Sequence, residues 1–246
     1  MLAKLVGLFL LGVVRLLTGA QARWVGCPPK AEQRIYFANH QSHADLVMIW
    51  AALPAELRGI TRPVAARDYW TKSALRLWIT SAIFHAVYVE RAGRSAMPAE
   101  AAGAVAAVAA NAVGVDAAAA RGDAPRAATA PMKFADLPVD DPLQPLAAAL
   151  DAGDSIILFP EGTRGQADEP QPFKSGLYQL ARMFPQVVLV PAWIDNIQRV
   201  MPKGEVVPVP ILCSVTFGAP LQVAEGEERR PFLDRARQAV MALRDV

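Results

Sequence analysis

The sequence predicts an α/β fold in which a central sheet is flanked by helices. Short runs of β-branched and aromatic residues recur along the chain, and longer segments with apolar residues at helical spacing separate them. An alternation of strands with helices is typical of a sheet that helices cover on both faces.

The expected strands are short and mostly apolar. Arg34-Ile35-Tyr36-Phe37-Ala38 is rich in residues that favour strands, and Ile156-Ile157-Leu158 forms the centre of a second apolar run. Strands are expected at residues 34–38, 59–65, 87–90, 155–159, 187–190 and 211–217.

The expected helices follow from apolar residues three or four positions apart. In residues 44–53, for example, Leu46, Ile49 and Trp50 share this spacing, and Pro54 ends the segment. Further helices are expected at residues 68–84, 142–151, 175–183 and 230–243.

The N-terminal segment predicts an association with a membrane. Residues 5–14 are uninterruptedly apolar, with Lys4 before them and Arg15 after them. The run is shorter than the roughly 20 residues that a membrane-spanning helix needs. Basic side chains beside an apolar run suit a helix lying in the membrane interface, although a tilted span and a cleaved signal peptide stay open. We therefore expect a membrane-anchoring helical segment at residues 1–26 and a second domain at residues 27–246.

An alanine-rich stretch interrupts this second domain. Eighteen of the 35 residues from 96 to 130 are alanine. Alanine favours helix, but the stretch lacks large apolar side chains with which a helix could dock. We expect an exposed insertion at about residues 93–140.

Composition excludes several classes of protein. The net charge of +2 and the charged fraction of 20% do not fit a nucleic-acid-binding protein, which normally has a concentrated basic patch. Cys27 and Cys213 stand far apart and form neither a CxxC motif nor a zinc signature.

The best candidate for chemistry is the pair His40 and Asp45. The segment from Asn39 to Asp45 follows an expected strand and opens an expected helix. Residues five apart do not share one face of a continuous helix. They can meet if His40 lies in the turn before the helix and Asp45 points back from its first turn. Asp45 would then fix the imidazole tautomer and leave the other ring nitrogen as a general base.

Cations and a glycine follow other expected strands. Phe159-Pro160-Glu161-Gly162-Thr163-Arg164 follows the strand at 155–159, and Arg91 follows the strand at 87–90. Open α/β sheets place ligand sites at the carboxyl ends of strands, and arginine suits phosphate oxygens. Lys174 adds a cation just before an expected helix N-terminus. The pattern indicates a phosphorylated acceptor.

Four ordered motifs make the sequence resemble the glycerolipid (lysophospholipid) acyltransferase family, which includes the 1-acylglycerol-3-phosphate acyltransferases. They are Asn39-His40-x4-Asp45, Val89-Glu90-Arg91, the segment from Phe159 to Arg164, and Val190-Pro191-Ala192. The resemblance implies a mixed sheet, His40 and Asp45 as the catalytic dyad, and Arg91, Glu161, Gly162, Thr163 and Arg164 in acceptor binding.

The resemblance also implies the reaction and its setting. We expect transfer of a fatty acyl group from acyl-CoA or acyl carrier protein to the free hydroxyl of 1-acylglycerol-3-phosphate, in phospholipid biosynthesis. The co-substrate thioester would be needed, but no cofactor and no metal. The expected partners are the lysophospholipid, the acyl donor and the membrane surface, at the cytoplasmic face of a bacterial inner membrane.

Other functions stay open on the sequence alone. The acceptor could be a lyso-ornithine lipid or another lysophospholipid, or the chain could be a non-catalytic lipid-binding membrane protein. A metal site formed by His40, His43 and Asp45 would be incomplete. A serine hydrolase would need a Gly-x-Ser-x-Gly motif, which the sequence lacks.

Overall fold

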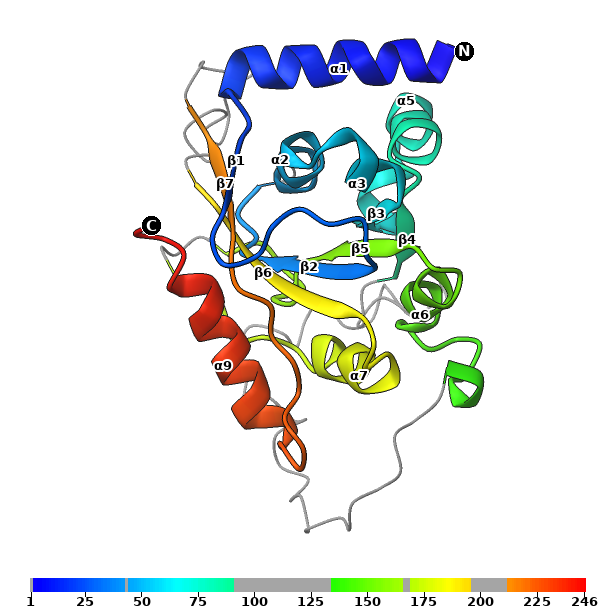
Figure 1. The fold of residues 1–246 in the computed structure, drawn as a ribbon. Coiled ribbons are helices and arrows are strands. Elements are labelled where there is room, and N and C mark those ends of the chain that lie inside the picture. The colour runs from blue at the N-terminus through cyan, green and yellow to red at the C-terminus, as the bar shows by residue number, and fades with distance from the viewer. Residues whose placement is uncertain (1, 43, 91–133, 166–168, 196–211) are drawn as a thin grey trace, which may run out of the picture.

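The computed structural model is built around one seven-stranded sheet with helices on both faces (Figure 1). It describes residues 2–42, 44–90, 134–165, 169–195 and 212–246. The expected α/β class, with a central sheet flanked by helices, is therefore confirmed.

The sheet is mixed, and β2 lies at its centre. The strand order is β1-β7-β6-β2-β5-β3-β4. Strands β6, β2, β5, β3 and β4 run parallel to one another, β7 is antiparallel to β6, and β1 is parallel to β7. The strands are β1 (Gln21–Trp24), β2 (Arg34–Ala38), β3 (Thr61–Ala66), β4 (Val87–Val89), β5 (Ser155–Leu158), β6 (Val188–Ile194) and β7 (Ser214–Phe217).

The helices of the described residues are mostly short. The α-helices are α1 (Leu2–Thr18), α2 (Asp45–Ala52), α3 (Ala55–Gly59), α4 (Arg67–Trp70), α5 (Ala74–Trp78), α6 (Gln144–Asp151), α7 (Gly176–Met183) and α9 (Arg229–Met241). A π-helix at Ile79–Ile83 and a 3₁₀-helix at Phe134–Asp136 complete the set.

The central strand β2 is buried along its whole length, although it begins with Arg34. All five residues of β2 are buried, since β5 and β6 pair with it on either side and helices cover both faces. Phe37 lies opposite Leu158 on β5 and opposite Pro191 on β6. The parallel register brings the carboxyl ends of β2 and β5 to the same edge of the sheet.

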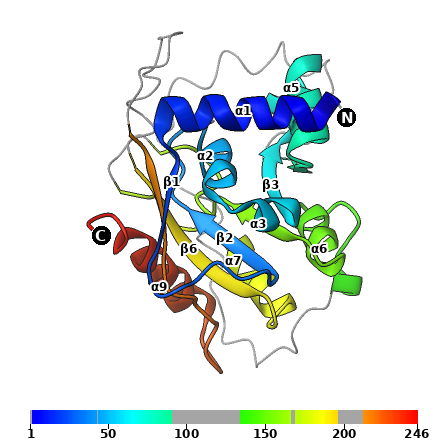
Figure 2. The ribbon, with the colours of Figure 1, turned by 45° about the horizontal axis from the view of Figure 1, so that its top comes forward.

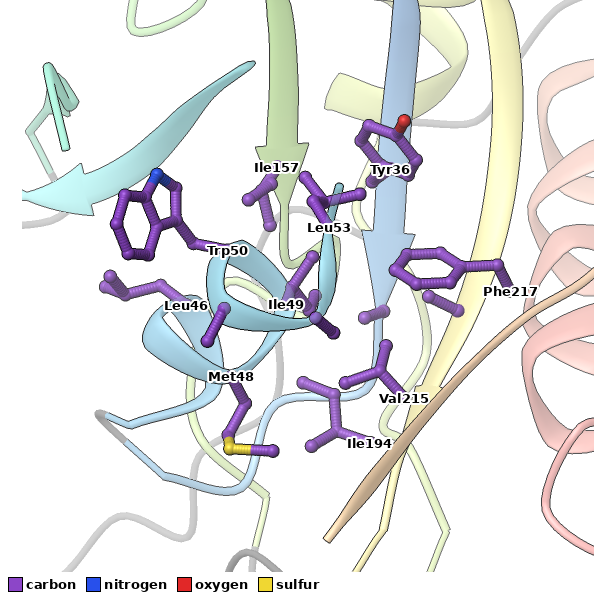
Figure 3. Packing of buried hydrophobic residues seen from close by; sticks show 14 of the residues in the cluster. Tyr36, Leu46, Met48, Ile49, Trp50, Leu53, Ile157, Ile194, Val215 and Phe217 are labelled. Carbon is purple, nitrogen blue, oxygen red and sulfur yellow. The ribbon is translucent and has the colours of Figure 1, made fainter. Parts of the chain in front are cut away.

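Helix α2 forms the centre of the core on one face. Ile49 of α2 and Leu53, the residue after its last turn, are fully buried and, in Figure 3, point toward the side chains of the sheet. Seven of its eight residues are buried, because the helix lies between the sheet and α1. A helix enclosed on both sides has no polar face, and this sequence has none.

Three helices cover the opposite face. Helices α6, α7 and α9 pack there against the alternate side chains of the same strands, among them Ile35, Phe37 and Ile156. Phe232 of α9 is fully buried in this second core.

Helix α1 lies across α2 on the outer side of the first core, as two views of the ribbon show (Figures 1 and 2). The side chain of Leu11 in this helix is buried, whereas those of Leu8 and Phe9 are 64% and 68% exposed. Among the described residues, no helix has both the length and the hydropathy needed to cross a membrane.

The N-terminal segment was expected to be helical up to residue 26, but its helix ends sooner and a strand follows. Helix α1 ends at Thr18, and Gln21–Trp24 forms β1, which pairs with β7. Gly19 and Ala20 have positive φ angles and turn the chain between the two elements. The sheet thus includes residues that the sequence had assigned to the anchor.

Two other expectations about secondary structure are corrected. The single helix expected at residues 68–84 is broken into α4, α5 and the π-helix, with an extended backbone at Ser73 (φ −135°, ψ 134°). The extended piece expected at residues 59–65 begins two residues later, as β3 at Thr61–Ala66, because Gly59 belongs to α3. Most of the alanine-rich insertion, residues 91–133, lies outside the described residues.

The α2 core supports a prediction about stability. Ile49→Ala removes a fully buried side chain between α2 and the sheet, and such truncations cost about 2–5 kcal/mol. The free energy of unfolding, measured by urea denaturation, should fall by that amount. Val139→Ala, at a side chain that is 91% exposed, is the control and should change it by less than about 0.5 kcal/mol. Equal effects of the two substitutions would contradict the α2 packing.

Candidate active site

The site begins where β2 ends. Asn39 is buried, and its side-chain amide donates to the Ile194 carbonyl at 3.1 Å and accepts from the Ile194 N–H at 2.8 Å. This pair of bonds continues the pairing of β2 and β6 beyond the last residue of β2. The backbone on which His40 stands is therefore attached to the sheet.

His40 and Asp45 form the hydrogen bond that their spacing predicts. His40 Nδ1 and Asp45 Oδ2 lie 2.8 Å apart. The Asp45 side chain is 1% exposed and the His40 side chain 18% exposed. Among the described residues His40 Nε2 has no hydrogen-bond partner, so this nitrogen can face a substrate. A carboxylate on Nδ1 selects the tautomer whose Nε2 is a base.

Asp45 also shapes the loop that carries His40. Its Oδ2 accepts hydrogen bonds from the backbone N–H groups of Gln41 at 2.6 Å and Ser42 at 2.8 Å. Asp45 is the first residue of α2, where a negative charge interacts favourably with the helix dipole. A single carboxylate thus folds the loop back and orients the imidazole.

The loop after β5 holds His40 from a second side. The Phe159 ring stacks on the imidazole with 4.3 Å between centroids and 18° between planes. Glu161 Oε1 accepts the His40 N–H at 2.7 Å, and the Gly165 N–H donates to the His40 carbonyl at 2.9 Å. The first and third sequence motifs are therefore in direct contact.

Glu161 is one of the few buried charged residues among those described. It is 2% exposed, and its second oxygen, Oε2, accepts the Gln171 N–H at 2.8 Å. Burial raises the pKa of its carboxyl group, although the hydrogen bonds from Gln171 and His40 act to lower it. Both oxygens are thus occupied by backbone donors within the protein.

Gly162 and Lys174 lie next to each other in the same loop. Gly162 has a φ of +69°, and a Cβ atom there would lie 2.8 Å from Lys174 Nζ. The glycine therefore permits both the left-handed turn and the close approach of the lysine. Thr163, Arg164 and Lys174 are exposed, and Thr163 Oγ1 lies 3.4 Å from Gln171 Oε1.

A small apolar cavity of about 40 Å³ adjoins His40. Residues of β2–α2, β3, α4 and β5 meet around it. Its lining is His40, Leu46, Val64, Ala66, Tyr69, Trp70 and Phe159. Trp70 of α4 contributes to this wall. A larger cavity of about 430 Å³ lies near Val187 and Gly226, at the amino end of β6 and hence at the opposite edge of the sheet.

The structure brings together most of the residues that the sequence selected. His40, Asp45 and Glu161 are in contact, and Gly162 and Lys174 approach each other beside them. Arg91 and His43 lie outside the described residues. Glu90 is described and exposed, just after the end of the edge strand β4.

Sequence reasoning missed several residues that build the site. His40 is held in place by residues from segments far apart in sequence. Asn39 binds the end of β6, the Phe159 ring stacks on the imidazole, and the Gly165 N–H donates to the His40 carbonyl. Asn39 and Phe159 belong to recognised motifs, but their contacts follow only from the pairing of β2 with β5 and β6.

Comparisons with known proteins agree with this site. The family model described as Acyltransferase matches residues 138–195, which include the third and fourth motifs. No curated protein matches the chain in sequence. The fold resembles the crystal structure of the 1-acyl-sn-glycerophosphate (LPA) acyltransferase PlsC from Thermotoga maritima. The TM-score is 0.58 at 16% identity, with 99% of this chain and 80% of that chain covered.

The family match covers α6, β5, α7 and β6, and it includes the loop after β5 that contacts His40. The fold of the chain is similar to that of the 1-acylglycerol-3-phosphate acyltransferase PlsC.

Proposed function

We propose that this enzyme transfers a fatty acyl group from an acyl thioester to the free hydroxyl of 1-acylglycerol-3-phosphate, with His40 as the general base. The main support for this proposal is the 2.8 Å contact of His40 Nδ1 with the buried Asp45 carboxylate. The thioester is acyl-CoA or acyl carrier protein and acts as a co-substrate, with no further cofactor.

The chemistry needs one proton acceptor at the acceptor hydroxyl. His40 Nε2 removes the hydroxyl proton while the oxygen attacks the thioester carbonyl carbon. Asp45 stabilises the imidazolium that forms. Collapse of the tetrahedral intermediate breaks the C–S bond, and the proton on His40 passes to the leaving thiolate. The products are the ester and the free thiol, and no covalent acyl-enzyme is required.

A phosphate-bearing acceptor is supported by the cations of the loop after β5. Arg164 and Lys174 are exposed, and Lys174 lies against Gly162 two residues before α7. This loop is bonded to His40 through Glu161 and Gly165. A phosphate held by the loop would bring its glycerol hydroxyl toward the base. Arg91 is expected to contribute a further cation.

The apolar side of the site suits the acyl group. The cavity beside His40 is lined by Leu46, Val64 and Trp70, and by the face of Phe159. Such surroundings exclude water from the reacting thioester, which limits its hydrolysis.

A membrane location is supported by the outer face of α1. Leu5, Leu8, Phe9 and Leu16 are 58–83% exposed on this helix, and Leu75 of nearby α5 is 64% exposed. Apolar side chains of this size at such exposure mark a surface that contacts lipid or another apolar partner. We propose that α1 lies in the membrane interface, at the cytoplasmic face of a bacterial inner membrane, where the lysophospholipid and the thioester donor can both reach the site.

Substitution of the dyad tests the chemistry. His40→Ala should lower kcat about 100- to 10,000-fold, because the general base is lost. Asp45→Asn should also lower kcat strongly, since an amide that donates to Nδ1 would leave the proton on Nε2. The measurement is release of the free thiol from acyl-CoA in detergent. Normal kcat in His40→Ala would refute the assignment of the base.

A panel of lysolipids tests the acceptor. Purified enzyme should prefer 1-acylglycerol-3-phosphate to lyso-ornithine lipid and to zwitterionic lysophospholipids, with either thioester donor. Lys174→Ala should raise the KM for this acceptor about tenfold, the loss of one charged contact. Lys30→Ala, at an exposed lysine of the β1–β2 loop, should leave the KM unchanged. A preference for another lysolipid would change the acceptor, and binding without turnover would indicate a lipid-binding protein.

Flotation with liposomes tests the membrane surface. Leu8→Glu combined with Phe9→Glu should greatly reduce co-flotation with phosphatidylglycerol and phosphatidylethanolamine vesicles, because it places charges on the exposed face of α1. Val139→Glu adds a charge at another exposed apolar residue and should float like the wild type. Equal flotation of both variants would exclude α1 as the docking surface.

A further inference from the structure

The segment after β5 contacts His40 at three different groups. Phe159 stacks on the ring, Glu161 accepts the backbone N–H, and Gly165 donates to the backbone carbonyl. His40 is the last residue before the loop that Asp45 folds back. Its position therefore depends on both the Asp45 loop and the segment 159–165.

The Glu161 carboxylate lies at the junction of these contacts. Oε1 accepts from His40, and Oε2 accepts from Gln171, so one side chain joins the His40 loop to the segment that leads to Lys174. The Lys174 N–H in turn donates to the Pro160 carbonyl at 2.8 Å. The carboxylate thus couples the position of the base to the position of a candidate acceptor cation.

The surroundings of Glu161 leave little room for a substrate. The residue is 2% exposed, and a Cβ atom at Gly165 would already lie 3.3 Å from Oε2. A buried carboxylate is costly unless hydrogen bonds compensate for lost hydration. Here two backbone donors supply that compensation, and burial keeps the carboxylate away from a bound acceptor.

We propose that Glu161 is a positioning residue, which holds His40 at the correct distance from the Lys174 segment, rather than a ligand of the acceptor. This inference rests on the proposed function of His40 as the base. It differs from the role in acceptor binding that the resemblance implied for Glu161, which stays a prediction.

Glu161→Gln is the decisive variant. Glutamine keeps the volume but offers one oxygen and one NH₂ group, so one of the two backbone N–H groups must lose its acceptor. We expect kcat to fall about 10- to 100-fold, as small displacements of a catalytic group do, with a smaller change in the acceptor KM. Glu56→Gln, at an exposed residue of α3, is the matched control and should retain wild-type kinetics.

A second measurement separates positioning from acceptor binding. In the acceptor-free protein, the side-chain ¹⁵N NMR signals of His40, assigned with His40→Ala, should shift in Glu161→Gln. A residue that only binds the acceptor would leave these signals unchanged and would raise the acceptor KM alone. That result, or a wild-type kcat in Glu161→Gln, would overturn the proposal.

Gly165→Ala tests the same contact without removing the charge. The added methyl group would press on Oε2, so kcat should fall several-fold and the His40 signals should shift in the same direction. Gly59→Ala is the control, because nothing lies within 4 Å of a Cβ atom there. Unchanged His40 signals in Gly165→Ala would contradict the coupling.

The experiment distinguishes two kinds of failure. If the wild-type enzyme transfers no acyl group to any lysolipid, the proposed function fails, while the NMR comparison still reports whether Glu161 positions His40. If transfer is observed and the Glu161→Gln signals and kcat match the wild type, the positioning role alone fails.

Discussion

The Asp45 carboxylate is the constraint on which the geometry of the site depends. One oxygen receives His40 Nδ1 and the backbone N–H groups of Gln41 and Ser42, all within 2.8 Å. The residue is fully buried at the start of α2, and these donors replace the lost hydration of Oδ2, whereas Oδ1 is buried without a hydrogen-bond partner among the described residues. The same contacts close the turn, place the imidazole and leave Nε2 for a substrate.

The order of strands in the sheet brings the other parts of the candidate site next to this turn. Strand β2 lies between β5 and β6, so the loop after β5 reaches His40 directly, and the end of β6 is clamped by Asn39. His40 and Asp45 lie at the carboxyl edge of parallel strands, where open α/β sheets bind ligands. Helix α2 connects this edge to α1. His40, the loop after β5 and the exposed apolar helix α1 thereby belong to one continuous framework.

Much of the fold could be predicted from local patterns. Strand β2 was predicted with its observed bounds, and α2, α6, α7 and α9 lie within one or two residues of expectation, because burial imposes a clear periodicity on their side chains. The break after α4 could not be predicted, since the apolar spacing continues across Thr71 and Ser73 while the backbone turns. Strand β1 was also missed. Four residues with alternating exposure carry little signal, and only pairing with β7 makes them a strand.

The candidate site, like the fold, was predictable only in part from the sequence. By itself the sequence determined that His40 and Asp45 can make contact, since they stand five residues apart at a strand–helix junction. It also determined that a glycine and two cations follow β5. Only the tertiary structure decided which groups Glu161 contacts, because its two backbone donors lie 121 and 10 residues away in the chain. Side-chain type indicates which bonds a residue can form, whereas strand order and burial determine which partners are within reach.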